Sequence, residues 1–407
     1  HGEQAHGRVR GLAGGSCRRR HCACHGGGQA HGHGRASVAL RSAARAAPKV
    51  MTAAEAVARF VRPGSVLGMG GQNIGRCPQA LTFEIIRQRI GDLTVVGCNL
   101  SLGMDQLVGA GLVRRTASGS GNLERFGVTY CWRRGIEDGI LAHEDYSHLA
   151  MVSRFLAGEM GVPFMPTRSL LGSDMLADAP MLAWVPAGAG ERAAGGTAPV
   201  QAAPAPPTVA DDAARQPSGT GPATGRAIGL RPPRATTVQR TVPPKAVVVD
   251  NPWAPGEPVV LVPALQPDVS IVHVQRADPL GNVVIEGFAT HEPEMLRASR
   301  AVIVSCEELV STDEIRAAPE RTTVPFLYVD AVVVQPFGAY PTSVYGYYDY
   351  DAAEVSRYQE AARSGPAAVA AYLQEAVWEC ATFDDYLARR AGPARLEALR
   401  AAMREVL

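Results

Sequence analysis

Short apolar runs that alternate with amphipathic helical segments are the feature that most restricts the fold of this chain. An apolar run of about four to eight residues favours a buried strand, whereas apolar residues spaced three and four apart favour a helix. The expected strands include 65–68, 93–96, 259–262, 270–275, 301–305 and 330–334, and the expected helices include 78–90, 104–110 and 291–300. This alternation predicts a wound α/β sheet.

Two segments interrupt the alternation. Residues 1–48 are rich in Gly, His, Arg and Ala, and residues from about 186 to 246 are rich in Ala, Pro, Gly, Thr and Arg. Neither segment can bury enough apolar surface to offset the entropy of ordering it, so we expect a disordered tail and a disordered surface insertion. An interdomain linker is the alternative for the second segment. With 46% apolar residues in the chain, we expect one α/β domain over residues 49–407.

Charge and cysteine usage limit the partners and the compartment. Forty basic and thirty-nine acidic side chains leave a formal charge of +1, which gives no case for binding nucleic acid or an anionic membrane surface. No stretch approaches the ~20 consecutive apolar residues of a membrane span. Cysteines scattered singly among apolar segments indicate reduced, buried thiols and a cytoplasmic protein. These are Cys77, Cys98, Cys131, Cys306 and Cys380.

A second group of cysteines lies in the tail, where Cys17, Cys22 and Cys24 adjoin His21 and His25. Cys and His are zinc ligands, so a metal site is conceivable there. The surrounding residues are Arg, Gly and Ala, which offer nothing to pack around a metal. We therefore expect a disordered tail and no bound metal.

A glycine-rich loop follows the first expected strand and reads Gly68-Met-Gly-Gly-Gln-Asn-Ile-Gly75. Glycine lets the backbone approach a ligand closely, and N–H groups before a helix attract anions. Gly70, Gly71, Gln72 and Asn73 are therefore candidate substrate-binding residues. The spacing fits neither a dinucleotide-binding nor a phosphate-binding motif. A plain tight turn is the alternative.

Further polar residues are expected in loops that begin at strand ends. These loops are Gly97 to Ser101, Ser118 to Asn122, and Gly338 to Pro341. Ligands of open α/β sheets gather outside the carboxyl ends of the strands. Asn99, Ser101 and Ser118 could therefore donate hydrogen bonds to a substrate carboxylate, with ordinary turn chemistry as the alternative.

The stretch from Pro263 to Gly287 has the most distinctive sequence in the chain. It reads PALQPDVSIVHVQRADPLGNVVIEG, which predicts a strand, a turn at Asp-Pro and Gly-Asn, and a second strand. Its PAL-x-PD, HVQ-x-AD and GN elements resemble the signature of the A subunits of family I CoA-transferases, of the glutaconate CoA-transferase kind. The resemblance extends over roughly residues 49–180 and 247–375.

The resemblance implies a three-layer open α/β sheet with helices on both faces, shared with sugar-phosphate isomerases. It also implies that coenzyme A thioester is a substrate, that no cofactor is permanently bound, and that a free carboxylic acid is the acceptor. A glutamate on a partner B subunit would attack the thioester and become a glutamyl-CoA thioester through an anhydride. The A subunits often have Phe after the paired glycines, where Gln72 stands here.

The nucleophilic glutamate of such enzymes lies in a Ser-Glu-Asn-Gly or Glu-x-Gly sequence. Glu137-Asp-Gly139 and Glu286-Gly287 occur here in other contexts, so we expect no catalytic residue in this chain. One alternative is a subunit of a hydrolase that opens a ring in a CoA thioester. Another is a non-catalytic ligand-binding protein on the same fold.

His143-Glu-Asp-Tyr-Ser-His148 gathers imidazoles and carboxylates within one short segment. Its two histidines are spaced i, i+5, which does not suit one metal on a helix face. We therefore expect this segment to be the entry to a helix.

Overall fold

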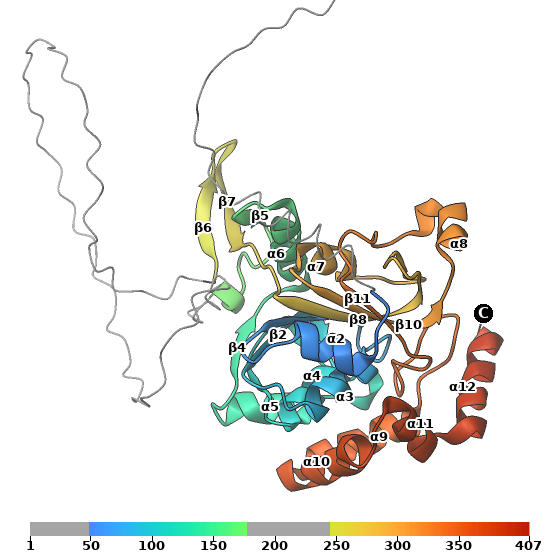
Figure 1. The fold of residues 1–407 in the computed structure, drawn as a ribbon. Coiled ribbons are helices and arrows are strands. Elements are labelled where there is room, and N and C mark those ends of the chain that lie inside the picture. The colour runs from blue at the N-terminus through green and yellow to red at the C-terminus, as the bar shows by residue number, and fades with distance from the viewer. Residues whose placement is uncertain (1–48, 177–244, 407) are drawn as a thin grey trace, which may run out of the picture. The chain divides into compact units, whose positions relative to one another are not determined.

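The computed structural model describes residues 49–176 and 245–406 of the chain, shown in colour in Figure 1. In these ranges an eight-stranded sheet has the order β11-β10-β8-β1-β2-β3-β4, and β9 pairs with β8. Its strands are β1 (Val66–Met69), β2 (Leu93–Leu100), β3 (Val113–Gly121), β4 (Ala142–Asp145), β8 (Val269–Ala277), β9 (Val283–Val284), β10 (Val302–Leu309) and β11 (Ala331–Val334). All neighbours along this order are parallel, whereas β9 runs antiparallel to β8. The predicted wound α/β sheet is confirmed.

Helices cover both faces of the sheet, with α6 and α7 on one face and α3, α4 and α5 on the other (Figure 1). The helices are α2 (Ala53–Phe60), α3 (Gln79–Arg87), α4 (Leu102–Gly109), α5 (Tyr130–Glu137), α6 (His148–Met160), α7 (Glu292–Ala298), α8 (Thr312–Ala317), α9 (Ala352–Ser364), α10 (Pro366–Leu373), α11 (Phe383–Arg390) and α12 (Gly392–Val406). Several begin at side-chain caps. The Thr52 and Glu55 side chains form a reciprocal capping box at α2, and the Ser147 hydroxyl accepts from the Ala150 N–H at α6.

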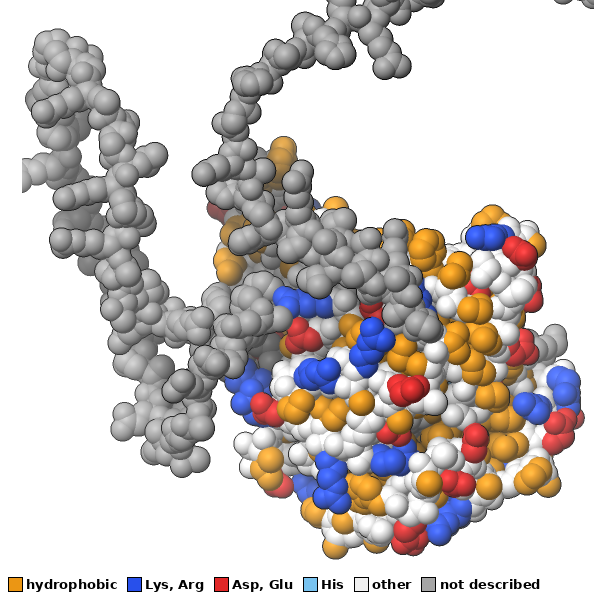
Figure 2. Space-filling model, viewed as in Figure 1, with side chains coloured by type: hydrophobic (Ala, Val, Ile, Leu, Met, Phe, Trp, Pro, Cys, Tyr) orange, Lys and Arg blue, Asp and Glu red, His pale blue; other side chains and the backbone are white. Residues whose placement is uncertain are grey.

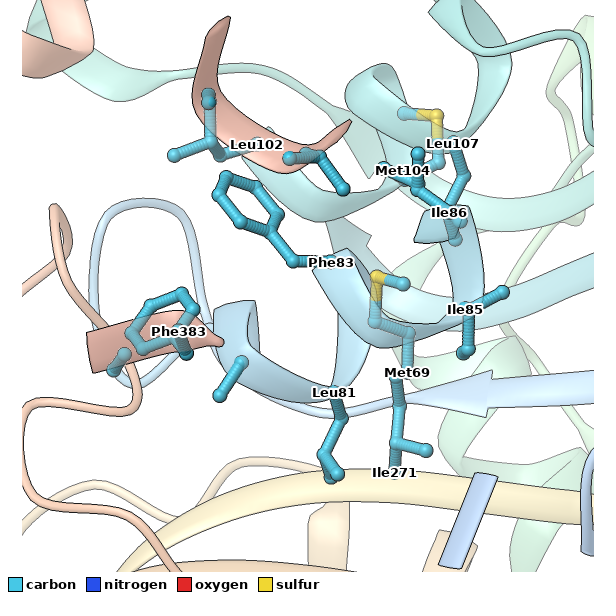
Figure 3. Close-up of a cluster of buried hydrophobic side chains, with 14 of the residues drawn as sticks. Met69, Leu81, Phe83, Ile85, Ile86, Leu102, Met104, Leu107, Ile271 and Phe383 are labelled. Atoms are coloured by element: carbon cyan, nitrogen blue, oxygen red, sulfur yellow. The ribbon is translucent and has the colours of Figure 1, made fainter. Parts of the chain in front are cut away.

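The core lies in two layers because successive strand residues point to opposite faces. In β8, Val269 and Ile271 join one apolar cluster, whereas Val272 and Val274 join the other. Figure 3 shows the first cluster, in which side chains of β1 and β8 meet α3, α4 and Phe383 of α11. Each large side chain that is fully buried in this way stabilises the fold by about 1.5–3 kcal/mol.

A small antiparallel sheet, in the order β5-β7-β6, stands beside the main sheet. Its strands are β5 (Phe164–Thr167), β6 (Val247–Asn251) and β7 (Ala254–Pro263). Lys245, shortly before β6, is buried, and its Nζ donates to the carbonyl oxygen of Asp145 over 2.8 Å. The end of the predicted insertion, at residues 245 and 246, is therefore ordered against the domain. The rest of that predicted insertion and the predicted tail lie outside the described residues.

A buried carboxyl group lies beside Lys245. Tyr146 donates its hydroxyl proton to Glu144 Oε2 over 3.3 Å, and Glu144 Oε1 has no hydrogen-bond partner among the described residues. Burial raises the pKa of Glu144 to about 7, although Arg154 and Lys245 oppose this shift. Glu144 is therefore a site where pH changes the free energy of folding.

The chain order of the main sheet reverses between β1 and β8. From β1 the chain proceeds through β2 and β3 to β4 in one direction, and from β8 through β10 to β11 in the other. In open α/β sheets the crevice outside the carboxyl ends of the strands at such a reversal is the usual ligand site. The loop after β1 carries the paired glycines Gly70 and Gly71, so it begins at this reversal.

The surface and the thiols agree with the composition. The cysteines of the described ranges, Cys77, Cys98, Cys131, Cys306 and Cys380, are buried and form no disulfide. Figure 2 shows Lys and Arg side chains interspersed with Asp and Glu side chains on the face in view. Across residues 49–176 and 245–406, each helix is too short or too polar to cross a bilayer.

Candidate active site

A pocket of about 640 Å³ opens at the carboxyl ends of the strands. Its lining comes from segments that follow β1, β3, β9 and β11. The lining residues are Gln72, Asn73, Ile74, Gly75, Arg76, Glu124, Arg125, Glu286, Gly287, Phe288, Ser343 and Tyr345. Two of the predicted site residues, Gln72 and Asn73, therefore line the pocket directly.

The paired glycines stand behind this lining, and their N–H groups are already used. Gly70 donates to the carbonyl oxygen of Ile271 over 2.9 Å, and Gly71 donates to Glu292 Oε1 over 2.8 Å. Gly71 has φ +87°, and an added Cβ would lie 2.8 Å from the Cα of Cys77. Glycine is therefore required at this position by conformation and by space. The two glycines shape the turn, while neither N–H is free for a substrate.

Arg76 ends the turn and fixes it to the rest of the domain. Its guanidinium forms a two-bond ion pair with Glu292 at the start of α7, with Arg76 Nη1 3.1 Å from Glu292 Oε1. Nη1 also donates to the His273 carbonyl oxygen over 3.2 Å, and Nη2 donates to that of Phe288 over 2.8 Å. Both side chains of the ion pair are buried. A planar guanidinium that serves two carbonyls and one carboxylate gives the turn a single position.

The tip of the turn is closed by two hydrogen bonds between Gln72 and Gly75. The Gln72 N–H donates to Gly75 over 2.8 Å, and the Gly75 N–H donates back to Gln72 over 2.7 Å. Asn73 between them has φ 51°, a left-handed conformation that Asn adopts more readily than most residues. Asn99 of β2 donates its side-chain amide to Asn73 Oδ1. The structure thus brings together one predicted residue from the loop after β1 and another from β2.

Ser101 and Ser118 lie away from the pocket lining. The Ser101 hydroxyl is 3.2 Å from the sulfur of Cys77, whose pKa burial raises to about 11. Ser118 is buried in β3, and its hydroxyl oxygen has no hydrogen-bond partner among the described residues. The prediction that Asn99 and Ser118 lie in loops was wrong, because β2 continues to Leu100 and β3 to Gly121. The last residues of both strands are polar, so a strand predicted from its apolar residues ends too early.

The signature stretch acts mainly by holding the pocket wall. The Gln275 side chain accepts from the Glu286 N–H and donates to the carbonyl oxygens of Glu286 and Tyr345, each over 3.1 Å. Asp278 accepts from the backbone and side-chain N–H groups of Asn282, which closes the turn between β8 and β9. These bonds place Glu286 and Tyr345 at the pocket.

The two glutamates that the sequence singled out occupy different surroundings. Glu286 lines the pocket, and its carboxylate pairs with Arg276 and with Arg321. Glu137 ends α5, where it forms an exposed i, i+4 pair with Arg133. Another carboxylate at the pocket belongs to Glu124, which is exposed to solvent.

A Ser-His-Glu arrangement lies buried in β8 and β10. His273 Nδ1 is 2.8 Å from the Ser305 hydroxyl, and its Nε2 is 2.7 Å from Glu307 Oε1. The Glu307 carboxylate also accepts from the Tyr348 hydroxyl and the Phe337 N–H, each over 2.8 Å. All three members are buried, so a substrate cannot reach the hydroxyl. The arrangement ties β8 and β10 to the loop after β11.

The helix-entry prediction for the segment 143–148 is confirmed at its end, where Ser147 caps α6 and His148 begins it. The segment starts in β4, and His143 Nδ1 is 2.9 Å from the Thr116 hydroxyl. In the part of the chain that the structure describes, no group of three or more His, Cys, Asp or Glu side chains could hold a metal ion. The cysteines of the tail lie outside those ranges.

Comparisons with known proteins identify the family. The coenzyme A transferase family profile matches residues 50–335. The chain is 31% identical to the A subunit of glutaconate CoA-transferase from Acidaminococcus fermentans, over 86% of this chain and 94% of the relative. It belongs to the coenzyme A transferase family. The resemblance of the Pro263–Gly287 stretch is thereby confirmed.

Solved structures and a further relative are similar to this chain in fold and in sequence. The crystal structure of the Acidaminococcus fermentans glutaconate coenzyme A-transferase matches with a TM-score of 0.69 at 30% identity, over 86% of this chain and 95% of that chain. The A subunit of 3-oxoadipate CoA-transferase from Pseudomonas knackmussii is 26% identical over 74% of this chain and 84% of its own length. A variant of the decarboxylase AibA/AibB matches with a TM-score of 0.56 at 26% identity, over 81% of this chain and 98% of that chain.

The predicted layered fold of this coenzyme A transferase is confirmed, but several site residues were missed. Arg76 directly follows the glycine turn, so its charge within an apolar surrounding was an available signal. Glu292 and Ser120 gave no such signal, because only the folded sheet brings them to the turn.

Proposed function

We propose that this chain is the A subunit of a heteromeric CoA-transferase. It would bind an acyl-CoA thioester and a free carboxylic acid, with the nucleophilic glutamate supplied by a partner B subunit. Its similarity to named A subunits over most of their length supports this assignment. Coenzyme A would be part of the substrate, with no permanently bound cofactor.

The observation that carries the proposal is the state of the carboxylates in the pocket. A nucleophilic carboxylate needs an oxygen that is free to attack the thioester carbonyl. Glu286 is instead held by Arg276 and Arg321, and the Glu124 side chain is exposed to solvent. A pocket of this volume with no prepared nucleophile suits a binding half-site that a second subunit completes.

In the proposed reaction, the partner glutamate attacks the thioester carbonyl carbon and expels the CoA thiolate, forming an anhydride. The thiolate then attacks the glutamyl carbonyl of the anhydride and releases the first carboxylic acid. The acceptor carboxylate reverses these two steps and leaves as the new acyl-CoA, so one thioester bond replaces another. This chain would bind and orient the acyl group beside the turn at Gln72–Gly75.

The test is transfer of CoA from an acyl-CoA to an isotopically labelled carboxylic acid. We expect no transfer by the purified chain alone, and transfer once a B subunit from the same organism is added. Borohydride should trap a glutamyl-CoA thioester on the B subunit. Transfer by the chain alone would contradict the proposal, and Glu124→Gln and Glu286→Gln would then be compared.

The same assay separates the alternatives. Free CoA that accumulates without consumption of the acceptor acid would favour a thioester hydrolase. Carbon dioxide released while the thioester persists would favour a decarboxylase, the activity named for one structural relative. Saturable binding of acyl-CoA by the complex without any turnover would favour a ligand-binding protein.

A further inference from the structure

A line of hydrogen-bonded side chains runs from the first residue of α6 to the pocket. His148 Nε2 is 3.0 Å from the Ser120 hydroxyl, which donates to Asn99 Oδ1 over 2.9 Å. Asn99 in turn donates its side-chain amide to Asn73 Oδ1 at the tip of the turn. The four residues come from α6, β3, β2 and the loop after β1. We name them the asparagine chain.

The hydrogen bonds of the asparagine chain all point in one direction. Ser120 has a single hydroxyl proton, which it gives to Asn99, so the Nε2 of His148 must carry the proton of the first bond. Asn99 uses its oxygen toward Ser120 and its nitrogen toward Asn73. Asn73 lines the pocket and accepts at its oxygen, so its Nδ2 group takes no part in the asparagine chain and is available as a hydrogen-bond donor.

The backbone at the tip adds further donors to the same wall. The N–H groups of Asn73 and Ile74 lie between the two bonds that close the turn, and neither donates to a backbone oxygen of the described residues. Both residues line the pocket. The N–H groups of Gly70 and Gly71 cannot serve this purpose, because they donate to Ile271 and Glu292.

We infer that the tip of the turn at Asn73 binds an sp² oxygen of the substrate, and that Asn99, Ser120 and His148 are positioning residues that keep the Asn73 amide nitrogen turned toward it. The oxygen belongs either to the thioester carbonyl or to the acceptor carboxylate, which offer the same lone pairs. This inference rests on the proposed function, since it assigns a role within the same pocket.

The asparagine chain has a consequence that packing alone does not produce. Ser120 has no place in the pocket lining, yet removal of its hydroxyl would free Asn99 to rotate and would release the Asn73 amide. Loss of the distant hydroxyl should therefore resemble loss of the Asn73 side chain itself. The backbone donors at the tip would remain in both variants.

The test compares Ser120→Ala, Asn73→Ala and the double variant in the complex with the B subunit, once assembly and thermal unfolding confirm that each folds. We expect each single variant to raise a KM or lower kcat/KM by about 10-fold to 100-fold, the scale of one or two hydrogen bonds to a charged acceptor. The double variant should be no worse than Asn73→Ala. A higher KM for the acid assigns the oxygen to the acceptor carboxylate, and a higher KM for acyl-CoA assigns it to the thioester.

Two further variants distinguish positioning from packing. His148→Gln keeps an N–H donor and should retain most activity, whereas His148→Leu should match Ser120→Ala. Thr116→Val is the matched control on β3, since Thr116 bonds to His143 and Trp132 and should leave both KM values unchanged.

Wild-type kinetics for Ser120→Ala, or effects of Ser120→Ala and Asn73→Ala that multiply in the double variant, would overturn the inference while the proposed function stands. Absence of transfer by the wild-type complex would overturn the proposed function instead.

Discussion

Arg76 and Glu292 form a buried ion pair whose carboxylate also accepts the N–H of Gly71. One carboxylate thus holds both the bend of the glycine turn and the arginine that ends it. The pair stabilises the wall of the pocket. Arg76 borders the pocket, but its guanidinium donates to protein groups.

Arg76→Met should lower the free energy of unfolding by about 3–5 kcal/mol, because it leaves the Glu292 carboxylate buried without its cation. The double variant Arg76→Met/Glu292→Leu should lose clearly less than the sum of the two single variants. Urea unfolding of the four proteins measures this coupling. Arg133→Ala breaks an exposed pair and serves as the control, with an expected change of about 1 kcal/mol or less. Strict additivity of the two buried substitutions would contradict the prediction.

Gly71→Ala tests the space behind the turn. The substitution combines a positive φ with a Cβ only 2.8 Å from Cys77, whereas Gly161→Ala has φ +70° with nothing within 4 Å. We expect Gly161→Ala to cost about 1 kcal/mol of stability and to leave turnover unchanged. Gly71→Ala should cost more, and it should slow CoA transfer by moving the turn. Equal thermal shifts and equal rates for the two variants would show that the turn has room to adjust.

Glu144 should make stability depend on pH. Burial raises its pKa from 4.5 to about 7 in the folded protein, so the unfolded chain releases this proton first as pH rises. The stability that the protonated group contributes is present below pH ~4.5 and is lost as pH rises through ~7. The free energy of unfolding of Glu144→Gln, measured relative to the wild type, should therefore be about 1–3 kcal/mol higher at pH 8 than at pH 5. Thermal unfolding of both proteins at several pH values provides the check, and parallel profiles would exclude the effect.

Ser305→Ala addresses the buried Ser-His-Glu arrangement. Because this hydroxyl is buried and bonded to His273, its removal should cost about 1–2 kcal/mol of stability and leave CoA transfer within a few-fold of wild type. Calorimetry and the transfer assay give the two readouts. A rate loss of ~10³-fold or more in a folded protein would mean that the serine takes part in the chemistry.

Local patterns in the sequence were sufficient to predict most helices and strands and much of the glycine turn after β1. The helical spacing of apolar residues at 78–90 predicted α3, and the apolar run at 270–275 predicted β8. The polar ends of β2 and β3 could not be predicted, because residues such as Asn99 and Ser120 are held there by hydrogen bonds to each other. The strand propensity of a residue does not include hydrogen bonds between side chains of neighbouring strands.

The site depended still more on contacts between distant residues. Gln72 and Asn73 could be placed near a ligand from the glycine loop alone, and both line the pocket. The commitment of the Gly71 N–H to Glu292 could not be foreseen, since 221 residues separate the two partners. The positive φ of the turn favours glycine at this position. Which group accepts a hydrogen bond from the glycine N–H depends on the tertiary fold.

The bonds that Arg76 makes to His273, Phe288 and Glu292 span 197, 212 and 216 residues. A nascent chain therefore displays the glycine turn long before any residue that can hold it has left the ribosome. Contacts of such long range form slowly, because a large loop must close before they contribute. A fragment that ends before α7 would contain β1 to β9 and the turn, yet it would lack Glu292, the carboxylate that accepts from the Gly71 N–H and pairs with Arg76.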